Sequence, residues 1–228
     1  MKTIPLQAID QQPSLLDEVC GVLLDGGLVC LPCESTYRIV ADLTNEVAVN
    51  RLMQSKRRTR QAPSLVFIDG EKMLYQVAAR VDPVTLRLAR QLWPGPLTIL
   101  FDPHPGLPAR VAKQLTKATG NLGVRVPQSL LLRRIVGGVK RPLLVSSANR
   151  EARQGAGSAA QVRKNFANRI EIFIEAGDLR PGPASTVVAI VDGQVKVTRP
   201  GAIDAERVVR VVYQSEVPEP ATDSALPA

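Results

Sequence analysis

Residues 121–149 read NLGVRVPQSLLLRRIVGGVKRPLLVSSAN, and this stretch decides the fold class. Two short apolar runs, Asn121–Val126 and Pro142–Ser146, are bounded by polar or turn residues, which is typical of buried strands. Between them, Ser129–Val136 has leucine, isoleucine and valine at helical spacing, which predicts a helix. A strand, a helix and a second strand in succession predict a sheet covered by helices, as in α/β folds.

Strands and helices continue to alternate on both sides of this stretch. Asp192-Gly193 between two apolar runs is a strong signal for a two-residue hairpin turn. Interleaved elements together with a hairpin predict an α/β fold with one mixed sheet. We therefore expect further strands at 28–32, 64–68, 97–101, 171–174, 186–191 and 194–198, helices at 14–25, 45–55, 71–79, 84–92, 159–166 and 205–212, a polar turn after residue 32, and a partly helical connection over 103–119.

The last segment of the chain differs from the body in charge. Residues 215–228 are proline-rich and contain three acidic side chains and no Lys or Arg. Such a composition predicts disorder, so we expect one domain over 1–213 and a disordered tail over 214–228. The net charge is +8, and without those acids the body carries +11. A basic body suits an anionic partner such as a nucleotide or RNA; a solvated basic surface is the alternative.

Several classes of function are disfavoured. No apolar run approaches the roughly 18 residues of a membrane span, and the first residues lack a signal-peptide core, so we expect a cytoplasmic protein without a membrane role. Cys30 and Cys33 have redox spacing, but residues three apart on a strand face opposite ways, which favours core or pocket cysteines. His104 is the single histidine and lies in a loop composition, which disfavours a histidine metal site or a Ser-His-Asp triad.

Any catalytic or binding function must therefore use Lys, Arg, Ser, Thr and Asn side chains and backbone groups. Lys56-Arg57-Arg58 closes the helix expected at 45–55, and such cations can hold a triphosphate or simply satisfy the helix dipole. Ser147 and Asn149 follow the strand Pro142–Ser146, at the strand end where open α/β sheets bind ligands. They can donate to phosphates or a ribose, and an ordinary turn is the alternative.

Three further polar residues accompany expected strands. Ser185 opens the hairpin and Arg199 lies on its return strand, while Arg125 lies mid-strand among apolar neighbours. A buried arginine needs an anionic partner, from the protein or from a ligand. The glycines at 155–157 do not directly follow a strand, so they indicate a hinge rather than a dinucleotide loop. Trp93–Thr98, WPGPLT, predicts a rigid structural turn.

Taken in order, these segments resemble the YrdC/YciO family over about residues 15–202. One such motif would be weak, whereas seven in order at sensible spacing are specific. The chain is thereby identified as a divergent, threonylcarbamoyl-AMP synthase-like member. The matching segments are PCESTYRI at 32–39, KRR at 56–58 with Pro63, WPGPLT at 93–98, GVRVP at 123–127, SAN at 147–149, STVV at 185–188 and RPGA at 199–202.

The resemblance implies a twisted mixed sheet with helices on both faces and a concave basic cleft. In such a cleft the family condenses L-threonine, bicarbonate and ATP into threonylcarbamoyl-adenylate, a nucleotidyl transfer. A partner transferase then modifies tRNA, so contact with tRNA or double-stranded RNA is implied. Carried over by motif, Lys56, Arg58, Ser147, Asn149 and Arg199 would hold ATP, and Ser35, Arg125 and Ser185 would hold threonine or a similar amino acid.

The same resemblance assigns no general base and no protein-bound metal. Mg²⁺ would accompany the ATP phosphates, and Arg125 would hold the threonine carboxylate. Carboxy-adenylate formation needs positioning and charge neutralisation more than proton transfer. The implied catalytic contribution is therefore the placement of two substrates rather than an acid–base residue.

The chain departs from the family pattern at several pocket positions. Cys33 replaces a threonine, Arg38 a glycine, Ala62 an asparagine, Phe67 a histidine and Asn121 a threonine. Lost polar contacts lead us to expect that threonine is a poor substrate. Arg38 either swings out to solvent or points inward and favours a more anionic ligand. The alternative function is a YrdC-like RNA- or ribosome-binding protein that has lost synthase activity.

Overall fold

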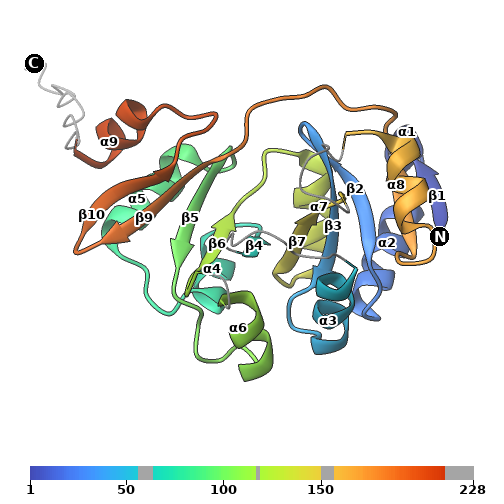
Figure 1. Ribbon diagram of the computed structural model, residues 1–228, viewed down its shortest axis with the longest axis horizontal. Helices are drawn as coiled ribbons and strands as arrows, with labels where there is room; N and C mark the ends of the chain where they lie inside the picture. Colours follow the sequence, from blue (N-terminus) through green and yellow to red (C-terminus); the bar gives the residue numbers. More distant parts are fainter. Residues whose placement is uncertain (56–63, 117–118, 150–156, 214–228) are drawn as a thin grey trace, which may run out of the picture.

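The computed structural model describes residues 1–55, 64–116, 119–149 and 157–213. Within these residues ten strands form a single sheet in the order β1-β8-β2-β3-β7-β4-β6-β5-β9-β10, which spans the molecule in Figure 1. Parallel pairs such as β4–β6 occur beside antiparallel pairs such as β5–β6, so the predicted mixed sheet is confirmed. The strands are β1 (Lys2–Pro5), β2 (Val29–Cys33), β3 (Thr36–Asp42), β4 (Ser64–Phe67), β5 (Leu97–Phe101), β6 (Leu122–Arg125), β7 (Leu143–Ser147), β8 (Ile172–Glu175), β9 (Thr186–Val191) and β10 (Gln194–Arg199).

Helices cover both faces of the sheet, with α3 in front of it and α7 behind it in Figure 1. Gly138 of α7 lies against Cys20 of α2, where an added Cβ would come within 2.7 Å of the thiol sulfur. No described helix is long and apolar enough to cross a bilayer. The helices are α1 (Leu6–Gln11), α2 (Pro13–Leu24), α3 (Glu46–Gln54), α4 (Glu71–Val77), α5 (Pro83–Leu92), α6 (Ala109–Thr116), α7 (Leu130–Val139), α8 (Ala159–Phe166) and α9 (Ala205–Tyr213).

Two predicted helix starts are confirmed by their caps. The Asn45 side chain accepts hydrogen bonds from the backbone N–H of Val47 at 3.0 Å and of Ala48 at 3.1 Å. Ser129 accepts one from the Leu132 N–H at 3.4 Å. Capping satisfies N–H groups that have no partner within the helix, so the side chains seen in the sequence fix where α3 and α7 begin.

The expected polar turn after residue 32 is present but is only two residues long, Glu34-Ser35, and the chain then forms β3 (Thr36–Asp42), a strand that the sequence did not predict. This strand pairs with β2 on one side and β7 on the other, and Ile39, Val40 and Ala41 are fully buried. Polar residues around Arg38 conceal a central strand whose apolar half lies in the core. The N-terminal β1 and α1 have no predicted counterpart either, since β1 depends on parallel pairing with the distant β8.

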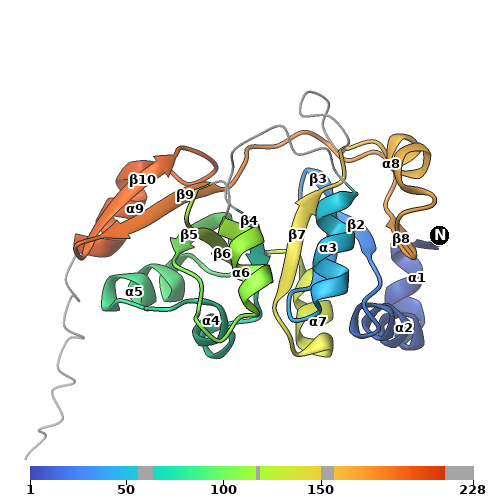
Figure 2. The same cartoon turned by 60° about the horizontal axis from the view of Figure 1, so that its bottom comes forward.

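Parts of the chain that are distant in sheet order meet on one side of the sheet. Glu34, in the turn between β2 and β3, pairs with Arg125 at the end of β6, although β7 and β4 lie between β3 and β6. In a flat sheet, three strand spacings would separate β3 from β6 by roughly 14 Å. The β2–β3 turn therefore lies within side-chain reach of the end of β6, and the connection over 176–185 runs from β8 to β9 past the sheet in both views (Figures 1 and 2). The predicted twisted, mixed α/β fold is confirmed.

Candidate functional site

A two-residue turn, Glu34-Ser35, joins β2 to β3 and forms one wall of the candidate site. Cys33 pairs with Thr36 at its base, and Glu34 has a φ of 55°, in the left-handed region that non-glycine residues seldom adopt. This conformation aims the Glu34 carboxylate at Arg125. Positive φ values at non-glycine residues gather at functional sites, where surrounding contacts hold them.

Arg125 is the buried cation of the site. The residue is 2% exposed, its Nε donates to the Gly95 carbonyl at 2.6 Å, and its guanidinium pairs with Glu34. The expected anionic partner is therefore supplied by the protein itself. These two contacts fix the plane of the Arg125 guanidinium. The directions of its remaining N–H groups are therefore fixed as well.

The Trp93–Thr98 segment holds the carbonyl that Arg125 contacts. Its Trp93-Pro94 peptide bond is cis, and the half-buried Trp93 donates from Nε1 to the Leu97 carbonyl at 2.8 Å. Gly95 is required here, because an added Cβ would come within 2.3 Å of the Leu92 carbonyl oxygen. These contacts agree with the predicted structural turn. The turn holds the Gly95 carbonyl oxygen where Arg125 can donate to it.

Ser185 lies at the centre of a hydrogen-bonded group on the other wall. Its hydroxyl is 2.9 Å from the hydroxyl of the buried Thr98, and Arg199 donates to the Ser185 carbonyl at 2.7 Å and to its hydroxyl at 3.0 Å. Gly201 packs against this residue so closely that a Cβ would come within 2.5 Å of the Ser185 carbonyl carbon. Gly201, two residues after Arg199, thus allows this strand end to approach Ser185 closely enough for Arg199 to donate to it.

Arg38 points inward from β3, which decides between the two orientations that the sequence left open. Its Nε is buried and has no hydrogen-bond partner among the described residues. In the sheet it stands opposite Ser147 of β7. Burial and then the positive charges of Arg38 and Arg125 lower the pKa of Arg199, so the three guanidinium groups share one region.

Cys33 lies beneath this arginine group. Burial raises the pKa of its thiol to about 11, while the charges of Arg38 and Arg125 oppose that rise and Glu34 adds to it. All three cysteines of the chain are free and buried, as expected for core or pocket cysteines. A thiol with so high a pKa is protonated at neutral pH and is a poor nucleophile.

The nucleotide-side candidates follow β7. Ser147 donates to the Asn149 side-chain oxygen at 2.8 Å, and the Ala148 N–H between them bonds the Tyr37 carbonyl at 2.9 Å. Both candidate side chains are partly exposed. The turn is thereby held to β3, next to Arg38.

Ser35 lies beside the connection that crosses the sheet. An added Cβ at Gly182 would come within 3.2 Å of the Ser35 Cβ, so this glycine allows close approach. Tyr37 anchors the same connection, because its hydroxyl donates to the Gly177 carbonyl at 2.6 Å and accepts from the Ala176 N–H at 2.9 Å. The turn bearing Ser35 is therefore covered by residues 176–185.

The described structure brings Arg125 and Arg199 together with Arg38 and places the other described candidates around these three arginines. Ser185 accepts from Arg199, Ser147 lies opposite Arg38 and donates to Asn149, and Ser35 directly follows Glu34, the partner of Arg125. Phe67 is fully buried and pairs in register with Arg125. Lys56, Arg58 and Ala62 lie outside the described residues.

Sequence reasoning missed two polar residues of this site. Glu34 belongs to the PCESTYRI segment, but the sequence predicts no role for it. Its role depends on its contact with Arg125, which lies 91 positions away in the sequence. Thr98 was assigned to a structural turn, yet its hydroxyl contacts Ser185. Among the described residues, no cluster of three or more His, Cys, Asp or Glu side chains could hold a metal ion.

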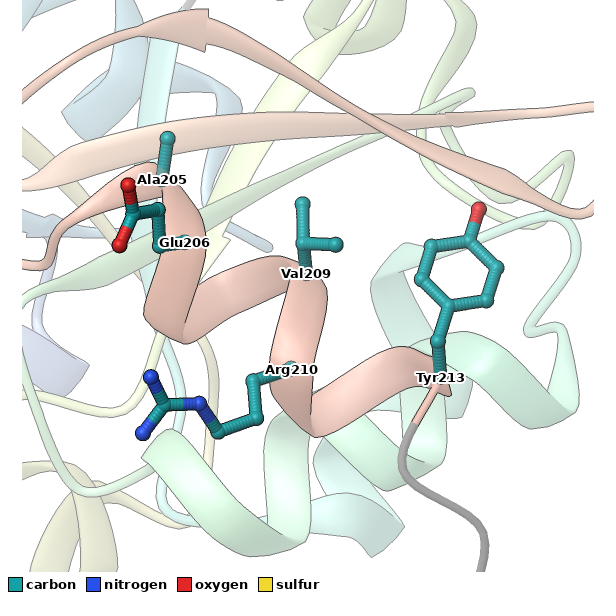
Figure 3. A pocket seen from close by; sticks show the side chains of 5 residues that line it. All are labelled: Ala205, Glu206, Val209, Arg210 and Tyr213. Carbon is teal, nitrogen blue, oxygen red and sulfur yellow. The ribbon is translucent and has the colours of Figure 1, made fainter.

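A separate surface pocket lies on α9 and shares no residue with the arginine site. Figure 3 shows Val209 and Tyr213 on one side of the helix, with Arg210 on another. This helix packs against α5 and β10. The lining residues are Ala205, Glu206, Val209, Arg210 and Tyr213.

The fold and the arginine site together define an α/β protein with a twisted mixed sheet and a group of three arginines, Arg38, Arg125 and Arg199, beside the β2–β3 turn. The chain belongs to the Sua5/YciO/YrdC family, whose model, described as "Telomere recombination", matches residues 21–201. The predicted family membership is thus confirmed.

Two relatives and two solved structures illustrate this membership. Threonylcarbamoyl-AMP synthase of Pyrococcus abyssi is 28% identical over 197 residues, which are 86% of this chain and 57% of that protein. Putative threonylcarbamoyl-AMP synthase of Methanocaldococcus jannaschii is 25% identical over 201 residues, 88% of this chain and 92% of that protein. The chain therefore spans little more than half of the first relative and nearly all of the second.

The structural likenesses agree with the sequence likenesses. The crystal structure of P. abyssi Sua5 complexed with L-threonine matches with a TM-score of 0.78 at 28% identity, over 89% of this chain and 58% of that one. E. coli YciO matches with a TM-score of 0.73 at 19% identity, over 85% of this chain and 92% of that one. The second likeness concerns the fold alone.

Proposed function

We propose that this chain is a threonylcarbamoyl-AMP synthase-like enzyme. Its reaction would join L-threonine or a similar small amino acid, bicarbonate and ATP into a carbamoyl-adenylate, with release of pyrophosphate. The observation that carries the proposal is the convergence of Arg125, Ser185 and Arg199 in a family whose relatives bear that enzyme name.

The amino-acid half of the proposed site is the wall formed by Ser35, Arg125 and Ser185. Arg125 is fixed by Gly95 and Glu34, and a fixed guanidinium suits a carboxylate because its N–H groups match the two oxygens. Ser185 would add a hydroxyl that Thr98 and Arg199 already orient. The complex of P. abyssi Sua5 with L-threonine supports an amino-acid ligand for this family.

The nucleotide half is assigned to Ser147, Asn149 and Arg199, together with Lys56 and Arg58. Ser147 and Asn149 come at the carboxyl end of β7, and Arg199 lies at the end of β10. Hydroxyl, amide and guanidinium groups are donors suited to phosphates and a ribose. Mg²⁺ would enter with the ATP phosphates, since Mg²⁺ commonly binds proteins through its nucleotide.

The chemistry asks the protein for alignment and charge neutralisation. The amine of the amino acid and bicarbonate yield a carbamate and water, and a carbamate oxygen then attacks the α-phosphorus of ATP as pyrophosphate leaves. Negative charge gathers where the two substrates meet, and fixed guanidinium groups stabilise such charge without reorganisation. A tRNA-modifying transferase would accept the product, with tRNA or another structured RNA as the macromolecular partner.

Pyrophosphate release tests the proposal. The full chain is incubated with ATP, Mg²⁺, bicarbonate and each common amino acid in turn, and release is followed against reactions that lack one component. We expect release that requires the amino acid and bicarbonate together, and that falls at least tenfold in an Arg125→Ala variant whose unfolding curve shows a folded protein. The proposal is contradicted if pyrophosphate release does not depend on bicarbonate, or if no amino acid gives pyrophosphate release.

A second candidate is an RNA- or ribosome-binding protein without synthase activity. The net charge of +8 and the departures at Arg38, Ala62 and Phe67 favour it. It predicts tight RNA binding that survives substitution of Arg125 and no pyrophosphate release. The same assay, run beside an RNA-binding titration, separates the two candidates.

A further inference from the structure

Arg38 and Arg199 have no acidic partner among the described residues, whereas Arg125 is paired with Glu34. Three guanidinium groups and one carboxylate therefore leave an excess of two positive charges in one partly buried region. The lowered pKa of Arg199, caused by burial and then by Arg38 and Arg125, reflects that crowding. A ligand with two negative charges would balance it.

Arg38 lies between the two halves of the proposed site. Opposed residues on antiparallel strands point to the same face, with Cβ atoms about 5 Å apart, so Arg38 adjoins Ser147 on the nucleotide side. On the amino-acid side its charge acts on Cys33, which directly precedes Glu34. The side chain thus stands where an amino-acid ligand would approach a nucleotide.

We propose that Arg38 forms an anion subsite for the carbamate group of an N-carboxylated amino acid, whose α-carboxylate is held by Arg125. This inference rests on the proposed function, because the reaction of an amine with bicarbonate creates that second negative charge. The carbamate is a dianion with its α-carboxylate, and it matches the excess charge of the arginine group. Arg38 would also hold the attacking oxygen next to the nucleotide half.

The subsite can be tested without ATP or turnover. Succinate carries a CH₂ where N-carboxyglycine carries an NH, so it is a stable dianionic analogue, and butyrate is its monoanionic counterpart. Calorimetry compares both anions with the unmodified protein and with Arg38→Met, Arg38→Lys and the control Arg110→Met, which removes an equal charge from an exposed position on α6. Unfolding curves establish that each variant is folded, and Arg38→Lys keeps the test available should Arg38→Met fail to fold.

We expect succinate to bind at least tenfold more tightly than butyrate, Arg38→Met to abolish that preference, Arg38→Lys to keep part of it, and Arg110→Met to leave it unchanged. Equal binding of succinate and butyrate by the unmodified protein, or an undiminished preference in Arg38→Met, would overturn the subsite. The outcome is distinguishable from failure of the proposed function. If succinate binding depends on Arg38 but no pyrophosphate is released, the synthase proposal is contradicted and the anion subsite is supported. If pyrophosphate is released but succinate binding does not depend on Arg38, the subsite is contradicted and the synthase proposal is supported.

Discussion

The carboxylate of Glu34 pairs with the guanidinium of Arg125, although β7 and β4 lie between β3 and β6. The pair ties the β2–β3 turn to the strand that carries the proposed carboxylate-binding arginine. The Arg125 guanidinium is therefore already paired with the Glu34 carboxylate. A substrate carboxylate that binds Arg125 must share the guanidinium with Glu34. The pair sets both the shape and the charge of the site.

Replacing Glu34 with glutamine should lower the free energy of unfolding. Arg125 is 3% exposed at its side chain and would lose its charged partner, but Glu34 is 32% exposed. We expect a loss of about 1–2 kcal/mol, below the cost for a fully buried pair because solvent reaches one partner. Urea unfolding followed by Trp93 fluorescence measures it, with Glu206→Gln on the exposed face of α9 as the control. Equal stabilities of the two variants would contradict the structural role of the pair.

The Thr98–Ser185 contact should matter for amino-acid binding. Ser185→Ala removes the hydroxyl that lies 2.9 Å from Thr98 and 3.0 Å from Arg199, while the Ser185 carbonyl still holds Arg199. We expect amino-acid affinity to fall about tenfold, the scale of about 1–2 kcal/mol for lost hydrogen bonds. Thr98→Val should cause a smaller fall by releasing the serine. Thr116→Val on α6, away from these contacts, should leave affinity unchanged, and a matching loss there would refute the specific role.

The buried thiols should resist alkylation in the native protein. Burial raises the pKa of Cys33 to about 11 and also raises that of Cys30, so both stay protonated at pH 8. Iodoacetamide should label them slowly at pH 8 and rapidly in urea, as mass spectrometry can measure. Because the folded pKa of Cys33 exceeds the ordinary value of 9.0, its contribution to stability is complete below about pH 9 and is lost as pH rises through about 11. Rapid native labelling of Cys33 would contradict the burial.

Arg58 should hold ATP phosphates. Its Lys-x-Arg spacing in the sequence motivates the substitution Arg58→Ala, which should weaken ATP binding by about 2–3 kcal/mol, the scale of a charge-assisted contact. Calorimetry of ATP binding gives the number, and Arg110→Ala provides a control with the same loss of charge. If Arg58→Ala binds ATP as tightly as the unmodified protein, the phosphate assignment is wrong.

Binding to structured RNA should weaken with salt. The net charge of +8 predicts several phosphate contacts, each of which releases counterions when it forms. The slope of log K against log salt should be clearly negative for tRNA, with shape mattering more than sequence. A filter-binding or fluorescence titration from low to physiological salt supplies the slope. No binding, or binding indifferent to salt, would count against an RNA partner.

Local patterns predicted most of the frame. The strands near 122–125 and 143–147 and the helix between them follow from short apolar runs and from apolar residues at helical spacing. The hairpin at β9–β10 follows from Asp192-Gly193, where both residues have positive φ. These features depend on residues close in sequence, so the sequence suffices to find them.

Features that depend on distant contacts could not be predicted. β3 is a strand because β2 and β7 pair with it on both sides, and its polar start conceals this. Arg125 was expected to need an anion, but nothing local indicates Glu34 as that partner. Thr98 gains its role only when β5 lies beside β9. The inward orientation of Arg38 was likewise left open, because a glycine-to-arginine change says nothing about where the side chain goes.

Transfer of labelled bicarbonate into an adenylate tests the central claim most directly. The unmodified protein is incubated with ¹³C-bicarbonate, ATP, Mg²⁺ and threonine, and products are separated and weighed by mass spectrometry. We predict an AMP adduct that carries one labelled carbon and one amino acid, that forms only when all three substrates are present, and that disappears in Arg125→Ala. Failure to form a labelled adduct with threonine or any other amino acid, by a protein shown to be folded, would contradict the synthase.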